Sequence, residues 1–192
     1  MYRHGVGTPT LADVADAAGI PLGNVYYYFK ARDELVASVI DSRVGELRSF
    51  LQSLDALPTP GARLRALVRT WVANREEVAA HGCPFGSLCS DLNKHDRGLD
   101  RRAAAILEEA VDWLTVQFRQ LGQPGPRDLA VTTLATVQGA ALLTNTFRDP
   151  RIMATQVRRL ERWIVTLEVP ERSGGTSMTK RPPRRSILKE EA

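Results

Sequence analysis

Residues 26–28 are three consecutive tyrosines in the stretch LGNVYYYFKARDEL. The whole chain has only four tyrosines, and a hydrophobic core gains nothing from three adjacent hydroxyl groups. Amphipathic aromatic rings suit a surface that touches a large polar partner. Asn24, Lys30 and Arg32 beside them supply amide hydrogen bonds and positive charge, which is the chemistry that recognises phosphates and base edges.

Two short helices are expected to position these residues. Thr10 can cap the first helix, because Asp13 follows three residues later and completes a capping box. That helix should end at Gly19, since glycine readily adopts the left-handed conformation that follows a helix. After the turn AGIP, Val25 and Phe29 stand four residues apart and give the second helix one buried face. Two short helices joined by a turn with a glycine predict a helix-turn-helix motif.

A helix-turn-helix places its second helix in the major groove of double-stranded DNA, with the first residues of that helix toward base edges. Gly23 would let the backbone approach closely, and Asn24 could bond an adenine edge or a phosphate. At least one of the three tyrosines must face away from the core toward the DNA backbone. Lys30 and Arg32 would follow as phosphate partners.

The stretch TLADVADAAGIPLGNVYYYFKARDELVASVID closely resembles the DNA-binding signature of the TetR family of transcriptional regulators, in its AcrR-like form. The shared features are a capped helix that ends in Ala-Gly, a Gly-x-x-Tyr-x-x-Phe pattern, and a basic residue and a leucine that open the next helix. The likeness covers about residues 5–47. It implies a homodimer that binds a palindromic operator, usually as a repressor, and is released when a small hydrophobic effector fills the larger domain.

The resemblance also implies roles for single residues. Tyr26 and Tyr28 would meet phosphates, and Arg32 stands where the family commonly has a lysine that does the same. Thr10 would lie next to the DNA backbone. The complete set of expected DNA-binding residues is Thr10, Gly23, Asn24, Tyr26, Tyr27, Tyr28, Lys30 and Arg32.

Two features depart from the family pattern. Pro21 and Leu22 stand where the family often has serine and lysine, which predicts the loss of one basic contact with the DNA backbone. The family also has a full helix before the turn at Gly5 and Val6, whereas only MYRH precedes that turn in this sequence. A truncated first helix is therefore expected, and a helical adaptor that no longer binds DNA is the corresponding alternative function.

Helical periodicity continues through the rest of the chain. Apolar residues repeat every three to four positions over 32–54, and a proline-rich segment ends that pattern. An all-α fold is expected, with a helix-turn-helix domain at 1–47, a helical ligand-binding and dimerisation domain at 48–168, and a disordered basic tail at 169–192. Further helices are expected at 62–80, 100–121, 127–147 and 150–167, with a short helix or turn at 82–92.

The helices expected at 127–147 and 150–167 are apolar on more faces than a monomer can bury. Ala135, Gly139 and Ala140 are small enough to let helices approach closely. A homodimer through residues 127–168 is expected, in which two copies of the helix pair form a four-helix interface.

By the same resemblance, a cavity for the effector should lie among the helices from 62 to 147. Walls that are mostly apolar and aromatic would suit a hydrophobic molecule held by a few polar groups. The candidate wall residues are Trp71, Arg75, Phe85, Leu88, Cys89, Leu92, Trp113, Gln117, Gln138 and Thr144.

Cys83 and Cys89 are the only cysteines, and they raise the alternative of a repressor that senses oxidants or electrophiles. No lysine or arginine lies between them to lower the pKa of either thiol. Six residues of regular helix rise about 9 Å, so a disulfide would need a bend. His81, Asp91 and His95 belong to the same segment, but their spacing is not a zinc pattern. Packing as small apolar residues is the simpler interpretation of the cysteines.

Composition sets the remaining limits. The 192 residues carry 26 Lys/Arg and 22 Asp/Glu, a net charge of +4. Residues 169–192 hold six of the basic and three of the acidic residues, or +3, so the charge of the body does not by itself predict a nucleic-acid surface. No glycine-rich phosphate loop or Ser/His/Asp set is recognisable, so neither an enzyme nor a cofactor is expected. No apolar run reaches the roughly 20 residues of a transmembrane helix and no signal peptide is recognisable, so a cytoplasmic protein without a membrane partner is expected.

Overall fold

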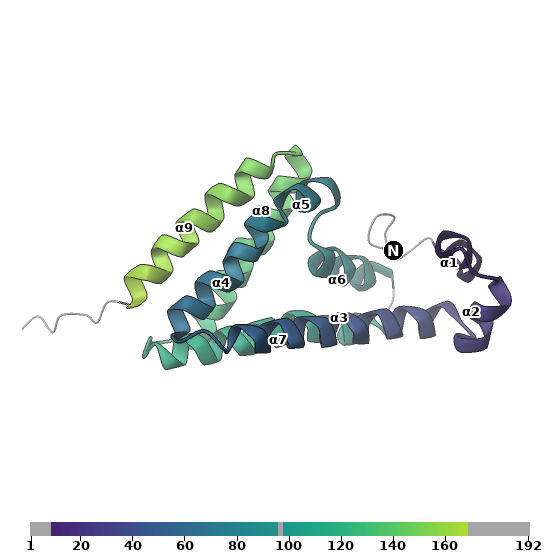
Figure 1. Ribbon diagram of the computed structural model, residues 1–192, viewed down its shortest axis with the longest axis horizontal. Helices are drawn as coiled ribbons and strands as arrows, with labels where there is room; N and C mark the ends of the chain where they lie inside the picture. Colours follow the sequence, from purple (N-terminus) through teal and green to yellow (C-terminus); the bar gives the residue numbers. More distant parts are fainter. Residues whose placement is uncertain (1–8, 96–97, 169–192) are drawn as a thin grey trace, which may run out of the picture.

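The computed structural model describes residues 9–95 and 98–168, and that part of the chain folds into nine α-helices without a strand. The expected all-α fold is confirmed. Two short helices lie at one end of an elongated molecule, and α3 runs from them along the other helices (Figure 1). The helices are α1 (Leu11–Ala18), α2 (Leu22–Tyr28), α3 (Arg32–Leu54), α4 (Pro60–Ala73), α5 (Arg75–His81), α6 (Pro84–His95), α7 (Asp100–Gln120), α8 (Pro126–Phe147) and α9 (Pro150–Glu168).

The expected capping box defines the start of α1. The Thr10 backbone N–H donates to Asp13 Oδ2 at 2.7 Å, and the Asp13 backbone N–H donates to Thr10 Oγ1 at 3.2 Å. The Thr10 backbone N–H and hydroxyl, which both donate to Asp13 Oδ2, hold the pKa of Asp13 below its ordinary value, so its carboxylate stays ionised to lower pH. Gly19 ends the helix with φ 66°, a left-handed conformation in which a side chain would be strained. Both ends of α1 therefore follow from local chemistry.

The helix expected at 62–80 is in fact two helices, α4 and α5, so that prediction was wrong. The break is at Asn74, whose side-chain Nδ2 donates to the Thr70 carbonyl oxygen at 2.8 Å. A short polar side chain that bonds nearby backbone in this way competes with the continuing helix. The α5 carbonyls of Ala79 and Ala80 accept hydrogen bonds from the Arg148 guanidinium at the end of α8. Tertiary contacts thus hold α5 in its own direction.

Three groups of buried side chains hold the helices together. A small one joins α1 to α2 through Leu11, Ala15 and Val25, with Phe29 and Leu35 packed against it. The second group joins α3 to α6 and α7. Its first member is Val36, which directly follows Leu35 of the first group in the sequence. The third lies among α4, α5, α7, α8 and α9. Because α3 belongs to the first and second groups, the domains expected at 1–47 and 48–168 share one continuous helix.

Several predictions fall on residues outside the described ones. The MYRH segment and the basic tail at 169–192 are among them.

The segment expected as a short helix or turn at 82–92 is the 12-residue helix α6. Among the described residues, no helix is long and apolar enough to cross a membrane, and no three His, Cys, Asp or Glu side chains gather as metal ligands.

Candidate DNA-binding surface and effector cavity

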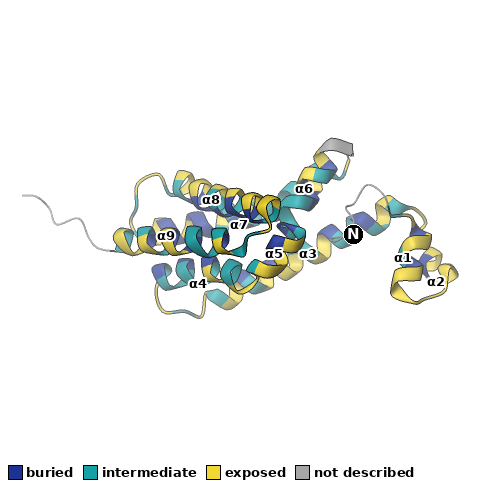
Figure 2. Cartoon of the chain, turned by 90° about the horizontal axis from the view of Figure 1, so that it is seen from above, coloured by how far each residue is buried: buried dark blue, intermediate teal, exposed yellow. Residues whose placement is uncertain are grey.

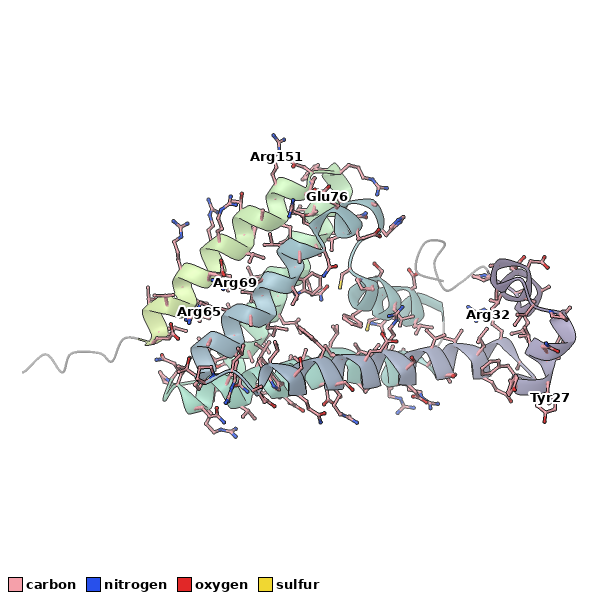
Figure 3. The ribbon with its side chains drawn as sticks, in the orientation of Figure 1. Tyr27, Arg32, Arg65, Arg69, Glu76 and Arg151 are labelled. Carbon is pink, nitrogen blue, oxygen red and sulfur yellow. The ribbon has the colours of Figure 1, made fainter. Side chains whose placement is uncertain are left out.

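The three tyrosines occupy the exposed face of α2. Tyr27 and Tyr28 are 75% and 74% exposed, and Tyr26 is 48% exposed, while Val25 between them and α1 is buried. Tyr27 extends away from the molecule at the end most distant from α9 (Figure 3). Its ring meets that of Tyr28 edge to face, with centroids 5.0 Å apart. Figure 2 shows α2 mainly as exposed, and the burial pattern makes it an amphipathic helix with the three tyrosines on its outer side.

The first turn of α2 is open to a partner. Gly23 and Asn24 are exposed, and a Cβ placed on Gly23 would have no atom within 4 Å. Nothing in the described chain therefore blocks the approach of a phosphate or base edge to this backbone. Thr10 is also exposed, at the start of α1, although its hydroxyl already donates to Asp13 Oδ2 at 2.7 Å.

The two basic residues differ in their surroundings. Lys30 Nζ donates to the carbonyl oxygens of Tyr26 and Tyr27 at 2.8 and 3.4 Å, where it caps the carbonyl end of α2. Arg32 lies at the start of α3 and pairs with Asp33 at 3.3 Å. Lys30 is thus in contact with α2, and the roles of both cations as phosphate partners remain predictions.

A cavity of about 250 Å³ lies in the larger helical part of the chain. Residues of five helices line it: α3, α4, α6, α7 and α8. Its walls are mainly apolar, which matches the pocket type that takes organic molecules. The lining residues are Glu46, Leu47, Phe50, Leu67, Val68, Thr70, Trp71, Phe85, Ile106, Leu107, Ala110, Leu114, Thr133, Leu134, Val137 and Gln138.

Three of the ten expected wall residues, Trp71, Phe85 and Gln138, line this cavity. Trp113 does not, and its indole N–H instead donates to Asp55 Oδ1 at 3.1 Å. Arg75 donates to the Val72 carbonyl oxygen at 3.0 Å, at the break between α4 and α5. The structure places the other five elsewhere in the interior: Leu88, Cys89, Leu92, Gln117 and Thr144.

The cavity wall also includes α3, which lies outside the expected range of 62–147. Glu46, Leu47 and Phe50 form one wall of the cavity. On α7 and α8 the lining residues recur every three to four positions, so they occupy one face of each helix. That periodicity was available from the sequence, but it does not distinguish a cavity wall from a filled core.

Both cysteines are buried and free. Cys89 Sγ donates to the Ala103 carbonyl oxygen at 3.3 Å, and burial raises the pKa of its thiol to about 11. Burial also raises the pKa of Cys83, and the smaller effects of nearby backbone N–H groups and of the neighbouring Gln138 side chain lower it. A raised pKa keeps each thiol protonated at neutral pH, and the thiol is the unreactive form. Burial and a raised pKa make both thiols poor sensors of an oxidant, so they favour the interpretation of the cysteines as packing residues.

Native protein should therefore react slowly with a thiol reagent such as a disulfide dye. The pKa of Cys89 lies about two units above its ordinary value of 9.0, so at pH 8 the thiolate fraction should be about 100-fold below that of an ordinary cysteine. Labelling of a Cys83→Ser variant should be slower by at least that factor in the folded protein than in denaturant at the same pH. Equal rates in the two conditions would contradict the assigned burial.

Comparison with known proteins bears directly on the family. Residues 60–158 match the domain family described as "Transcriptional regulator LmrA/YxaF-like, C-terminal domain", and this match covers more than half of the chain. Residues 1–39 match "Bacterial regulatory proteins, tetR family". The chain belongs to the TetR family. It is a DNA-binding transcriptional regulator with an N-terminal helix-turn-helix domain and a C-terminal helical domain, as the resemblance predicted.

Several relatives of this TetR-family chain carry similar descriptions. ArpR of Pseudomonas putida, a probable HTH-type transcriptional regulator, is 44% identical over 157 residues, 72% of this chain and 71% of ArpR. TtgR, an HTH-type transcriptional regulator that is also from Pseudomonas putida, is 44% identical over 120 residues, 56% of this chain and 54% of TtgR.

Solved structures agree on the fold of this TetR-family chain. A TetR transcriptional regulator from Legionella pneumophila superposes with a TM-score of 0.76 at 16% identity, over 84% of this chain and 89% of the other. A TetR-family regulator from Agrobacterium tumefaciens gives 0.75 at 22% identity, over 84% and 90%.

Proposed function

We propose that this TetR-family regulator is a repressor that binds a palindromic operator as a homodimer and is released by a small hydrophobic effector. The observation that carries the proposal is the double role of α3. This helix begins four residues after the tyrosine face of α2 and later supplies Glu46, Leu47 and Phe50 to the cavity. A ligand that favours one position of α3 would also favour one position of the DNA-binding helices.

An exposed apolar face on α8 supports dimerisation. Val131, Leu142 and Leu143 are all exposed, with the exposed small residues Ala135 and Gly139 on the same side of the helix. A face of this kind, large at its ends and small in the middle, suits close packing against a second copy. Ala140, the third small residue expected there, is instead buried within its own chain.

Two ion pairs attach α3 to α7 near the cavity. Arg102 donates to both carboxylate oxygens of Asp41 at 2.9 and 2.5 Å. Arg48 donates to both carboxylate oxygens of Glu109 at 3.0 and 2.8 Å, and its hydrogen bonds hold the pKa of Glu109 below the ordinary value. The partners are seven residues apart on each helix, and their charges are reversed. Sliding one helix by two turns would oppose like charges, so the pairs favour a pivot of α3 over a slide.

Breaking the pair nearer the DNA-binding end should make release easier. In Asp41→Arg, two guanidinium groups would face each other, and α3 would leave α7 at lower cost. We expect the effector concentration for half-maximal release of the operator to fall by about threefold. The factor is small because exposed ion pairs contribute little to the stability of a packed pair of helices. The double variant Asp41→Arg/Arg102→Asp should restore the wild-type response in a fluorescence-anisotropy titration. A double variant as altered as the single one would refute the role of this pair.

The proposed function is tested by selecting operators from random duplexes with the purified protein. The selected sites should be palindromes whose half-site centres lie about one helical turn, or 34–36 Å, apart. Binding to the selected site is then measured with a panel of apolar compounds and with a mild oxidant, for wild type and for Cys83→Ser/Cys89→Ser. Release of both proteins by an apolar compound is the expected result. Asymmetric sites, or release by oxidant alone and only in the wild type, would overturn the proposal.

A further inference from the structure

Gln138 lines the cavity, and the nitrogen of its side-chain amide lacks a hydrogen-bond partner in the described part of the chain. Its Nε2 atom is shielded from solvent and makes no hydrogen bond to the described residues. The side chain lies near enough to Cys83 to affect that thiol, yet the sulfur is not at hydrogen-bond geometry. A buried donor left without an acceptor is costly, so such groups in folded proteins usually have a partner or a function.

The hydroxyl and carboxylate groups of the wall are already engaged. Thr70 Oγ1 donates to the Leu67 carbonyl oxygen at 2.7 Å, and Thr133 Oγ1 donates to the Leu129 carbonyl oxygen at 2.8 Å. Both hydroxyls are thus tied to their own helices. The Glu46 carboxylate accepts hydrogen bonds from Arg43 at 2.7 Å and Ser42 at 3.2 Å. Gln138 is thus a lining residue whose Nε2 donor still lacks an acceptor among the described residues, and a ligand that reaches this atom can supply one.

Gly86 on α6 leaves the space that this amide occupies. A Cβ added at Gly86 would lie 2.4 Å from Gln138 Oε1 and 3.3 Å from Gln138 Cδ. Any larger residue at this position would push the amide away. The absence of a side chain at Gly86 thus sets where the Nε2 donor lies relative to the cavity.

The charges of the wall limit the ligand further. Among the described residues that line the cavity, Glu46 is the single ionisable one, and none is a lysine, arginine or histidine. A ligand anion would be desolvated beside a carboxylate, which is strongly unfavourable. The volume of about 250 Å³ is close to the lower end of organic-ligand pockets. Phe50, Trp71 and Phe85 add flat aromatic surface.

We propose that the effector is a neutral, compact aromatic molecule with a carbonyl or ether oxygen that accepts a hydrogen bond from Gln138 Nε2. This inference rests on the proposed function, in which the cavity is the effector site. It adds the selectivity of that site: a pure hydrocarbon of the same shape leaves the amide without a partner, whereas a ketone satisfies it.

The test uses tetralin and tetralone, which share a bicyclic body and differ by one carbonyl group. Equilibrium dialysis gives the ratio of their dissociation constants for wild type, Gln138→Leu and Gly86→Ala. Comparing this ratio between proteins cancels the cost of removing the carbonyl from water. We expect Gln138→Leu to reduce the preference for tetralone by about tenfold, the effect of one buried hydrogen bond. Gly86→Ala, which keeps the amide but displaces it, should reduce the preference in the same direction.

A Leu134→Trp variant, which fills the cavity, separates the two levels of the proposal. Suppose that Leu134→Trp abolishes binding of both ligands, but the ratio of dissociation constants is the same in wild type, Gln138→Leu and Gly86→Ala. The cavity is then the ligand site, and the role of Gln138 is refuted. If neither ligand binds the wild type, or Leu134→Trp binds both unchanged, the cavity is not the site and both proposals fail. Circular dichroism spectra of the three variants establish that each is folded.

Discussion

Replacing Gly139 with arginine is expected to convert the proposed dimer to a monomer and to weaken operator binding by about 10²- to 10⁴-fold. Gly139 lies in the middle of the exposed apolar face of α8, and a Cβ there would meet no atom of its own chain within 4 Å. The substitution should therefore leave the fold of one protomer intact. Between two closely packed copies of α8, however, two guanidinium groups would be buried without partners. A monomer holds only one half-site, and the loss of the linked second site accounts for the expected magnitude.

Gly45→Arg is the matched control. Gly45 is also an exposed helical glycine whose Cβ would meet no atom within 4 Å, but it lies on α3 and not on the apolar face of α8. Light scattering at micromolar concentration should find Gly45→Arg dimeric and Gly139→Arg monomeric. If Gly139→Arg remained a dimer with full operator affinity, the α8 face would not be the interface.

Tyr28→Phe is expected to weaken binding of the proposed dimer to every duplex by at least about 100-fold. Removing the hydroxyl would delete one hydrogen bond to a phosphate in each half-site, and such bonds to charged groups contribute about 1.5–3 kcal/mol. Tyr28 is 74% exposed, so the fold should not change, and phenylalanine retains the ring that packs against Tyr27. Tyr26→Phe should behave in the same way.

The salt dependence distinguishes this loss from a change in charge or specificity. Tyr28→Phe should leave the slope of log affinity against log salt unchanged, because the tyrosine is neutral. Arg32→Ala should lower the slope by about one ion per half-site. Asn24→Ala, at the first turn of α2, should instead alter which operator is preferred. A shift in base preference with Tyr28→Phe would show that the phosphate role is assigned to the wrong residue.

The sequence by itself determined the features that depend on neighbouring residues. Three such features follow from residues only a few positions apart in the sequence. They are the capping box of Thr10 and Asp13, the left-handed conformation of Gly19, and the burial of Val25 opposite the tyrosines. Helix type and most helix ends were predictable for the same reason, since apolar periodicity records which face must be buried. The TetR-like signature in this region was sufficient to identify the family.

Only the tertiary structure decided which apolar faces enclose a cavity and which fill a core. Trp71 and Leu88 read alike in the sequence, yet one lines the cavity and the other packs between α3, α6 and α7. The break at Asn74 also depends on tertiary contacts. Arg148 donates a hydrogen bond to the carbonyl oxygen of Ala79 in α5, 69 residues away in the sequence, and so holds α5 apart from the line of α4. Helical periodicity shows that a face is buried, but the partner of that face depends on how distant helices cross. The missing partner of Gln138 Nε2 likewise depends on how α8 packs beside the cavity that five helices line.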